Sequence, residues 1–462
     1  MKADEHLEII RRNLFYGLIE YTKSLPDLFI PHRFSMVGPS KGKKLLDTVV
    51  DAVKGEEELL LYFHLPFCFS ECTFCNSFPH ETDREVQDEY LNSMIREIDI
   101  FSKSGIFAGK KARCIYFGGG TPTAFSNRDI KRILDKVGSS MDLASNCNIT
   151  IEAHPATVAE RKRIKGLADS GITRMSVGCQ TFDEKVLQRC HRSNTESEVY
   201  KVIMNTKESG LSSNIDMMIG LPGQTVEAVK RDLEILDRIQ SDSIEYIRHE
   251  IVNPLAISLY KRNRDLLVHD DDLFQMVCLT QQWIDERGYE QNGHFRNDKH
   301  FPYRYYWLKE MPILAFGPRT RSYTKYVCYD KHEELSSYFR LCTKGIPPIG
   351  RYIALTKKEQ MYRSLFLQIQ IREGLALKDF ENRYNEDALE TFAPFLERGL
   401  EYGCIQTDKD SVRLTKYGRY FVEDVCCLIL DCALNEFDAN LKREPHSSTA
   451  LSSRLDSLSG AT

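Results

Sequence analysis

One stretch organises the whole chain: Tyr62-Phe63-His64-Leu65-Pro66-Phe67-Cys68-Phe69-Ser70-Glu71-Cys72-Thr73-Phe74-Cys75. It is an apolar run that ends in three cysteines with the spacing C-x3-C-x2-C. The pattern predicts a strand that leads into a short loop, and the loop brings three thiolates together. Three thiolates can hold three corners of a cubane iron–sulfur cluster, which leaves the fourth iron for a ligand other than protein.

A zinc site and a disulfide are the alternatives for three clustered cysteines. Structural zinc sites take four ligands, and no second C-x2-C or H-x3-H follows at a suitable spacing. An odd number of cysteines, behind an N-terminus that does not resemble a secretory signal, disfavours a disulfide. The sequence therefore favours a cluster held by Cys68, Cys72 and Cys75.

This spacing resembles that of the radical S-adenosylmethionine (SAM) superfamily. The resemblance implies that the amino acid end of SAM binds the fourth iron. It also implies that an electron from the cluster cleaves the sulfonium and gives a 5′-deoxyadenosyl radical.

Composition limits the class of protein. The chain has 462 residues, enough for two or three domains, and 42% of them are hydrophobic. Its net charge of -5 gives no reason to expect a nucleic-acid surface. No apolar run approaches the roughly 20 residues needed to span a bilayer. Fourteen cysteines without a secretory signal indicate a reducing compartment, so we expect a cytoplasmic protein whose other cysteines are mostly core residues.

From residue 58 onward, apolar strands alternate with longer helical patterns. This alternation predicts a parallel sheet with right-handed crossovers, and six such units suit an α/β fold of the partial (β/α)6 barrel type. The predicted strands are Leu59–Leu65, Arg113–Phe117, Cys147–Glu152, Arg174–Val177, Ser213–Ile219 and Ser243–Ile251. The predicted helices are Asp83–Lys103, Asn127–Val137, Thr157–Ser170, Asp183–Cys190, Glu196–Glu208 and Val226–Ile239.

Four regions are predicted: an N-terminal arm over 1–57, the barrel with an extension over 58–350, a winged-helix-like domain over 351–440 and a disordered tail over 441–462. The arm contains a predicted helix, Leu7–Leu18, which either packs on the barrel or covers the substrate side. The C-terminal domain combines predicted helices with a hairpin, and its balance of acids and bases argues against DNA binding. Its predicted elements are the helices Met361–Gln370, Leu377–Tyr384, Leu389–Gly403 and Tyr417–Leu434 and the strands Cys404–Thr407 and Ser411–Leu414.

Polar or glycine-rich motifs follow the predicted strands, where parallel barrels collect their chemistry. Three glycines, 118–120, end the second strand and let the backbone approach a ligand closely, as binding the methionyl group of SAM requires. Glu152 closes the third strand and can pair with an ammonium or with ribose hydroxyls; the alternative is a solvated acid at a strand end.

Gln180 follows the fourth strand, and Arg192 lies twelve residues further on. An amide suits ribose or a carboxylate, and a guanidinium can hold a carboxylate with two hydrogen bonds; a surface salt bridge is the alternative for Arg192. Asp216 lies inside an apolar strand, where an unpaired charge is costly, so we expect it to have a partner such as ribose hydroxyls.

Together these motifs resemble the oxygen-independent coproporphyrinogen oxidase (HemN-like) group of radical SAM enzymes. The resemblance covers residues 59–323 and continues more faintly to about residue 434. It implies a [4Fe-4S] cluster, two bound SAM molecules and an electron donor such as flavodoxin or ferredoxin. The residues that it assigns to SAM binding are Tyr62, Phe74, Gly119, Gly120, Thr121, Glu152, Gln180, Arg192 and Asp216.

The chain departs from the oxidase directly after the third cysteine, where Asn76-Ser77 replaces Gly-Cys. This departure favours the HemN-like branch of methyltransferases, cyclopropanating enzymes and HutW-like haem-opening enzymes. We therefore predict transfer of a methyl or methylene carbon from a second SAM to an sp2 carbon. An oxidase-like decarboxylase and a haem chaperone without turnover are the alternatives.

The substrate is expected to be planar and unsaturated, either an aromatic compound, a tetrapyrrole or a polyene. The aromatic and basic segment from His294 to Trp307 could stack on such a molecule, although it could equally pack on the barrel. Tyr62, His249 and Glu250 are the candidate catalytic residues, the last two because they follow the sixth strand.

Overall fold

The computed structural model describes residues 7–9, 11, 35–38, 41–75, 77, 80–81, 83–251, 253–290, 295–296 and 302–437. Several predictions therefore lie wholly or partly outside the described residues. They concern most of the arm helix over 7–18, Asn76, residues 294 and 297–301 of the aromatic segment, and the tail over 441–462.

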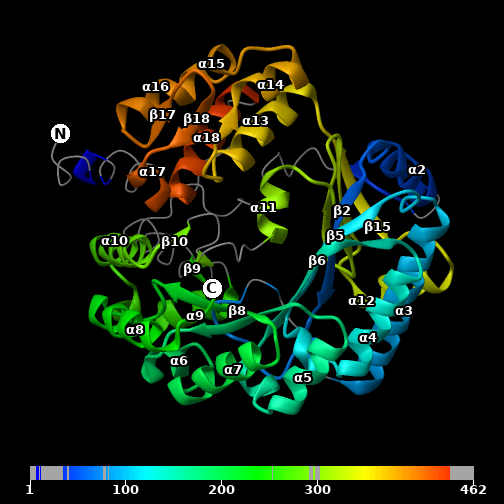
Figure 1. The fold of residues 1–462 in the computed structure, drawn as a ribbon, viewed down its shortest axis with the longest axis horizontal. Helices are drawn as coiled ribbons and strands as arrows, with labels where there is room; N and C mark the ends of the chain where they lie inside the picture. Colours follow the sequence, from blue (N-terminus) through cyan, green and yellow to red (C-terminus); the bar gives the residue numbers. More distant parts are fainter. Residues whose placement is uncertain are drawn as a thin grey trace.

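Six parallel strands, adjacent in chain order, form an open barrel with helices around its outer face (Figure 1). The strands are β2 (Glu58–Leu65), β5 (Lys111–Gly119), β6 (Asp142–Ala153), β7 (Arg174–Gln180), β8 (Ser212–Ile219) and β9 (Ser243–Arg248). The helices are α3 (Arg84–Lys103), α4 (Asn127–Gly138), α5 (Arg161–Asp169), α6 (Glu184–Arg189), α7 (Glu196–Glu208) and α8 (Val226–Ile239). The predicted partial barrel is confirmed.

Side-chain caps explain where these helices begin. Asp83 accepts a hydrogen bond from the backbone of Val86 at the start of α3. Ser126 and Asp129 form a reciprocal capping box at the start of α4, as the [ST]-x-x-[DE] pattern requires. For most of these helices, the polar residue before the apolar run therefore predicted the first helical residue to within one position.

Several predicted boundaries in the barrel were wrong. β6 begins at Asp142 rather than Cys147, and β7 ends at Gln180 rather than Val177. The helix predicted to begin at Thr157 begins at Arg161, because Pro155 starts a separate 3-10 turn over Pro155–Val158. The sixth strand ends at Arg248 rather than at 251. Beyond it the chain turns into α9 (Pro254–Arg262), whose first residue is a proline that cannot donate to a sheet.

Additional strands extend both edges of the barrel sheet. β12 (Ile313–Phe316) pairs in parallel with β2. Four more strands follow outward from β12, and each is antiparallel to its neighbour. These are β13 (Arg321–Tyr323), β14 (Val327–Lys331), β15 (Ile349–Ala354) and β1 (Ser35–Met36). On the other edge lie β11 (Phe295–Arg296) and β10 (Tyr289–Glu290). The apolar run from Leu314 to Phe316, followed by Gly317-Pro318, predicts a short strand that leads into a turn, and β12 lies there. The other added strands were not predicted.

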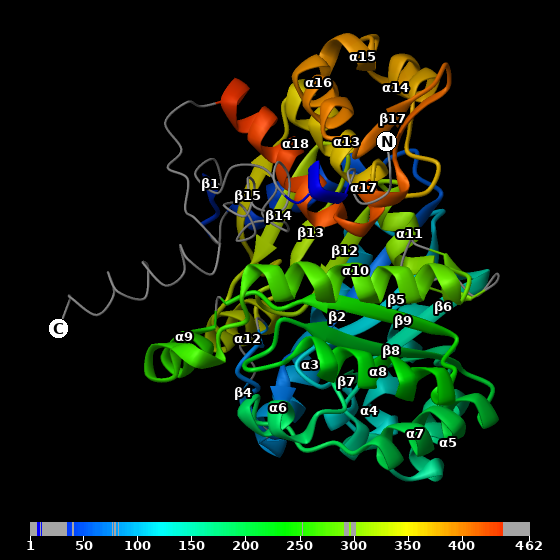
Figure 2. The same ribbon diagram turned by 90° about the vertical axis from the view of Figure 1, so that its left-hand side faces the viewer.

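A C-terminal domain lies above the barrel, beside α10 and α11 (Figure 2). It combines helices with a three-stranded sheet, β16-β18-β17. Its elements are α13 (Lys357–Gln368), β16 (Leu375–Ala376), α14 (Leu377–Tyr384), α15 (Ala388–Thr391), α16 (Ala393–Glu401), β17 (Ile405–Thr407), β18 (Ser411–Leu414), α17 (Lys416–Tyr420) and α18 (Val422–Phe437). The remaining elements are α2 (Gly42–Ala52), β3 (Phe67–Cys68), β4 (His80–Glu81), α10 (Asp270–Glu286), α11 (Pro302–Leu308) and α12 (Leu335–Thr343).

Two long helices predicted in this domain are each broken. The helix over 389–403 breaks at Phe392, because Pro394 lacks the N–H that a helix interior requires. The helix over 417–434 breaks at Phe421, a buried residue whose ring stacks on Phe274 of α10 at 5.2 Å. The second break depends on a tertiary contact and has no local signal in the sequence.

In the part of the chain that the structure describes, no helix combines the length and the apolar character that a membrane crossing requires.

Candidate active site

A cavity of about 770 Å³ opens at the carboxyl ends of the barrel strands. It is lined by the loop that carries Cys68, Cys72 and Cys75, here called the cluster loop. The ends of β5 to β9 and one residue of the C-terminal domain, Glu423, complete the lining. Most of the predicted site residues meet here. They are Cys68, Cys72, Phe74, Cys75, Gly119, Gly120, Thr121, Glu152, Gln180, Arg192, Asp216 and Glu250.

Each of the three cysteine thiols on the cavity wall faces a hydrogen-bonding group. The first, Cys68, lies 3.1 Å from the hydroxyl of Thr121. The second, Cys72, accepts from Nη1 of Arg192 at 3.6 Å, and the third, Cys75, accepts from the backbone N–H of Ser77 at 3.4 Å. Donors aimed at sulfur favour the thiolate form that a metal cluster requires.

The three thiols can supply three corners of a cubane cluster. Among the described residues, no three His, Cys, Asp or Glu side chains converge on a point that could hold one metal ion. A cubane instead takes its thiolates at separate corners. Burial raises the pKa of Cys68 to about 11 and also raises the pKa of Cys75. Cluster binding must therefore release protons from these thiols.

The glycines after β5 form a close-fitting wall of the cavity. Gly119 has a φ of +119°, and a Cβ on it would lie 2.8 Å from Nδ1 of His64. A Cβ on Gly120 would lie 2.9 Å from the backbone nitrogen of Phe67. Since real Cβ atoms do not approach so closely, both positions require glycine, and the backbone is left exposed to a ligand.

Glu152 lies beside this wall. Its carboxylate accepts from the hydroxyl of Tyr116 at 2.7 Å and from the N–H of Gly119 at 3.1 Å. Burial raises the pKa of Glu152 to about 7 despite these two donors. An ammonium group entering the cavity would favour the charged form, which is the chemistry expected for binding the amino acid end of SAM.

Asp216 has partners from two strands. Its carboxylate accepts from the hydroxyl of Ser176 at 3.0 Å and from the side-chain amide of Asn214 at 2.5 Å. Burial, with a further contribution from Glu245, raises the pKa of Asp216 to about 7. The predicted need for a partner is thus met partly within the protein, and the same carboxylate still faces the cavity.

Gln180, at the end of β7, and Arg192, in the loop after α6, also line the cavity. Gln180 has a φ of 76°, a strained conformation for a residue with a side chain, and its buried Oε1 has no hydrogen-bond partner among the described residues. Nη2 of Arg192 donates to the carbonyl of Gly178 at 2.5 Å. An unsatisfied amide oxygen beside a fixed guanidinium is an arrangement that a polar ligand would complete.

Two predicted residues do not line the cavity. Tyr62 lies behind the glycines: its hydroxyl hydrogen-bonds to Nδ1 of His64 at 3.1 Å, and its ring stacks on Tyr116 at 6.0 Å. His249 packs near Tyr260, with ring centroids 6.3 Å apart, and burial lowers its pKa to about 4. Tyr62 is therefore placed to support the glycine wall, and His249 lies away from the cavity.

Glu250, in contrast, lines the cavity, and burial raises its pKa to about 7. Several site residues were missed by sequence reasoning. Asn214 had a signal, since it lies two positions before Asp216 and hence on the same face of the strand. Tyr116, Ser176 and Glu423 had none, because only pairing between strands and domains brings them here.

Comparison with known families agrees with this architecture. Residues 62–236 match the family model of the radical SAM superfamily, and residues 355–421 match the model of the HemN C-terminal domain. The first match covers the loop with the three cysteines and the barrel from within β2 to within α8, and the second covers most of the C-terminal domain. Fold and cavity together define a radical SAM protein.

The chain is similar to proteins whose names refer to heme, anaerobilin or coproporphyrinogen. The chain is 26% identical over 374 residues to the heme chaperone HemW of Lactococcus lactis, covering 77% of this chain and 93% of the relative. It is 24% identical over 396 residues to the oxygen-independent coproporphyrinogen III oxidase of Escherichia coli K12, with coverage of 80% and 85%. It is 23% identical over 386 residues to the anaerobilin synthase of Escherichia coli O157:H7, with coverage of 82% and 85%.

The solved structure of coproporphyrinogen III oxidase HemN from Escherichia coli superposes with a TM-score of 0.76 at 22% identity, covering 89% of this chain and 98% of that one. This likeness concerns the fold. With both domain matches in the same order along the chain, the protein belongs to the HemN-like family of radical SAM proteins.

Proposed function

We propose that this chain binds a tetrapyrrole beside a [4Fe-4S] cluster and SAM, either to deliver haem or to carry out porphyrinogen chemistry. The proposal rests on one cavity in which three thiols, a glycine wall and four polar side chains meet. Three of these side chains, Glu152, Gln180 and Asp216, come from different strands, and Arg192 comes from the loop after α6. Support for the tetrapyrrole comes from the relatives, whose names refer to heme, to anaerobilin and to coproporphyrinogen.

When bound, the cluster supplies the electron that cleaves the sulfonium of SAM. The chain's own residues then have separate tasks. Cys68, Cys72 and Cys75 would hold the cluster. The backbone at Gly119 and Gly120 would lie against the methionyl group, with Glu152 accepting from its ammonium.

In the same cavity, Arg192 would hold a carboxylate and Asp216 would accept from ribose hydroxyls, both groups found in SAM. An external donor of the flavodoxin or ferredoxin kind would supply the electron to the cluster. Glu250 lies on the C-terminal side of the same cavity and, with a pKa of about 7, can hold or release a proton near a substrate.

Carbon transfer from a second SAM is the second candidate function. Asn76-Ser77 favours it, because the oxidase pattern has Gly-Cys at these positions, and the sequence prediction rested on that departure. The comparisons give methyl transfer and cyclopropanation no support, so this function ranks below the tetrapyrrole alternatives. The prediction that two SAM molecules bind is part of this carbon-transfer function.

Anaerobic incubation of the reconstituted protein with reductant, tetrapyrrole and methyl-deuterated SAM tests these functions together. A chaperone retains haem unchanged and forms no 5′-deoxyadenosine in step with substrate loss. A decarboxylase consumes coproporphyrinogen, releases CO2 and forms unlabelled 5′-deoxyadenosine. Carbon transfer forms labelled 5′-deoxyadenosine with S-adenosylhomocysteine. Failure to bind or consume any tetrapyrrole would overturn the leading proposal.

A further inference from the structure

A second cavity, of about 390 Å³, lies between the barrel and the C-terminal domain. Its walls come from β9, α10 and α11 on one side and from α13, α17 and α18 on the other. It adjoins the cavity at the carboxyl ends of the barrel strands, because Ile247, Arg248 and Glu423 line both. A ligand in one cavity would therefore lie next to the other.

The residues shared by the two cavities include one apolar side chain, Ile247, beside the ion pair of Arg248 with Glu423. The side chain of Ile247 is 41% exposed there, although it lies near the end of a barrel strand. Further in, the second cavity is lined by aromatic side chains of the C-terminal half, among them Trp307, Phe366 and Tyr420. An exposed isoleucine leading to several rings suits a flat, largely apolar molecule.

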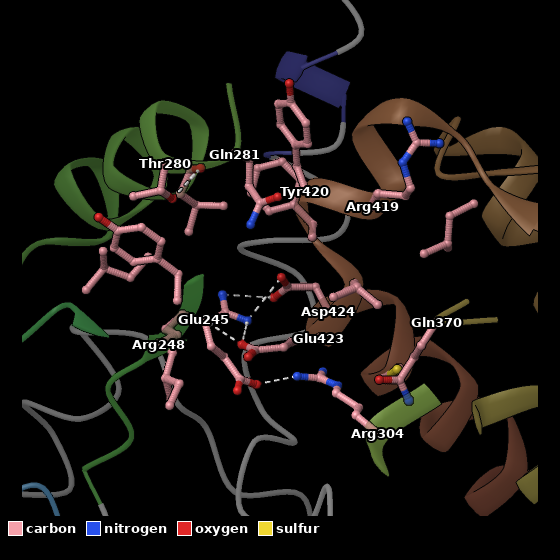
Figure 3. A pocket seen from close by; sticks show the side chains of 18 of the residues that line it. Glu245, Arg248, Thr280, Gln281, Arg304, Gln370, Arg419, Tyr420, Glu423 and Asp424 are labelled. Atoms are coloured by element: carbon pink, nitrogen blue, oxygen red, sulfur yellow. Dashed lines mark hydrogen bonds and ion pairs between the residues drawn. The ribbon is translucent and has the colours of Figure 1, made fainter. Parts of the chain in front are cut away.

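Most charged groups around this cavity neutralise one another. Arg248 donates to Glu423 at 2.9 Å and to Asp424 at 3.1 Å, and Arg304 pairs with Glu245 (Figure 3). These pairs connect the end of β9 to α18 and to α11, so they fix the cavity walls and leave little charge available to a ligand.

Arg419 stands apart from both ion pairs in Figure 3. It is half-buried on α17, lines the cavity, and its guanidinium has no hydrogen bond or ion pair with any other described residue. Asp285 influences it from a distance, but that carboxylate accepts from the hydroxyl of Tyr420 at 2.7 Å. A half-buried cation without a partner is costly, and a ligand carboxylate would relieve that cost.

A second polar group that lines this cavity, on the side of the barrel, has no partner among the described residues. The indole N–H of Trp307, on α11, is buried and has no acceptor among the described residues. Since buried donors are nearly always paired, we expect a ligand to supply an acceptor for this N–H.

We infer that the second cavity takes the carboxylate-bearing edge of the tetrapyrrole, with Arg419 pairing with a carboxylate of the ligand. The inference rests on the proposed function, because it assigns a subsite for the same ligand. It makes Arg419, a residue of the C-terminal domain, a determinant of specificity for the free acid over an uncharged ester.

Haemin and haemin dimethyl ester are the probes, since they share the iron and the ring and differ only in their carboxylates. The intact, cluster-loaded protein should bind haemin about tenfold more tightly than the ester, the usual effect of one charge-assisted hydrogen-bonded pair. Arg419→Gln should bind both as weakly as wild type binds the ester. Arg419→Lys, which keeps the charge, should retain part of the preference.

Arg413→Gln is the matched control, because Arg413 lies in the same domain but pairs with Asp408 away from the cavity. It should bind both probes as wild type does, and all variants should keep their iron content and SAM affinity. A wild-type preference that survives in Arg419→Gln would overturn the subsite while leaving the proposed function intact. Failure of the wild type to bind either probe would overturn the subsite and haem delivery, whereas consumption of coproporphyrinogen tests porphyrinogen chemistry separately.

Discussion

Nη1 of Arg192 lies 3.6 Å from the Sγ of Cys72, although the two residues are 120 positions apart in the chain. The same guanidinium donates to the carbonyl of Gly178 at 2.5 Å, so the barrel fixes its position. A fixed cation beside a cluster thiol can act in two ways: it stabilises the thiolate, and it offers a carboxylate site at the cluster.

Replacing this guanidinium should separate the two effects. Arg192→Lys keeps the positive charge but loses the two-pronged geometry that suits a carboxylate. We expect iron content to be retained and SAM affinity, measured by equilibrium dialysis, to fall about tenfold or more. Arg231→Lys, at an exposed ion pair with Asp183, is the control and should change neither. Unaltered SAM binding in Arg192→Lys would remove the carboxylate role.

The cluster assignment predicts which cysteines control iron binding. Replacing Cys68, Cys72 or Cys75 singly by Ala should abolish reductive cleavage of SAM, and replacing all three should remove the iron. Cys426→Ala, a change at a buried thiol of α18, should leave the iron content of the reconstituted protein unchanged. Iron and sulfide analysis measures this, and a triple variant that still holds a full cluster would refute the assignment.

Asp216 is predicted to act on the ligand more than on the fold. Asp216→Asn should weaken SAM binding by about 1–3 kcal/mol, the scale of a lost charged hydrogen bond. Its stability without ligand should not fall, because the pKa of Asp216 is raised to about 7 and its charged form is disfavoured by burial.

Asp129→Asn is the matched comparison. Asp129 is also buried, but it caps α4 and accepts from Arg84 at 2.9 Å, and its pKa is lowered. This change should lower the free energy of unfolding by about 1 kcal/mol and leave SAM affinity as it was. If Asp216→Asn unfolds the protein while Asp129→Asn does not, Asp216 is structural.

The raised pKa of Glu152 predicts a pH-dependent stability. The pKa is about 7 in the folded chain against an ordinary 4.5, so between these values the folded chain binds more protons than the unfolded chain. The free energy of unfolding must then fall as pH rises through this window, by on the order of 3 kcal/mol in total. Glu152→Gln removes this titration and should gain stability relative to wild type between about pH 5 and pH 8.

Urea unfolding of the ligand-free protein at several pH values measures the difference between wild type and Glu152→Gln. Glu227→Gln, on the exposed side of α8, is the control and should have a small effect throughout. A constant difference between wild type and Glu152→Gln across the window would contradict the prediction. Saturating SAM should reduce the pH dependence, because its ammonium favours the charged carboxylate.

A buried ion pair links α3 to the added strand β14. Lys331 and Glu97 are both 0% exposed, and Glu97 also accepts from the hydroxyl of Tyr338 at 2.7 Å. Lys331→Ala leaves a buried carboxylate without its cation and should destabilise by about 3–5 kcal/mol. Lys325→Ala, at a more exposed pair with Glu56, should change stability by less than about 1 kcal/mol. Equal losses of stability in the two variants would show that burial does not increase the contribution of the ion pair.

The sequence alone determined features that depend on local pattern. The spacing of Cys68, Cys72 and Cys75 lies within one loop, and the glycines after β5 follow one strand, so both were readable without coordinates. The parallel order of the six strands followed from the alternation of strands and helices, since short crossovers permit one handedness.

Only the tertiary structure decided which groups complete the site. Ser176 and Asn214 reach Asp216 because β7 and β8 pair in a particular register, and Tyr62 is covered by the glycines because β2 lies beside β5. Glu423 and Arg419 come to the barrel from a separate domain, at separations in sequence that no periodicity records. Local spacing fixes the backbone around each motif, whereas strand register and domain packing fix the side chains that face it.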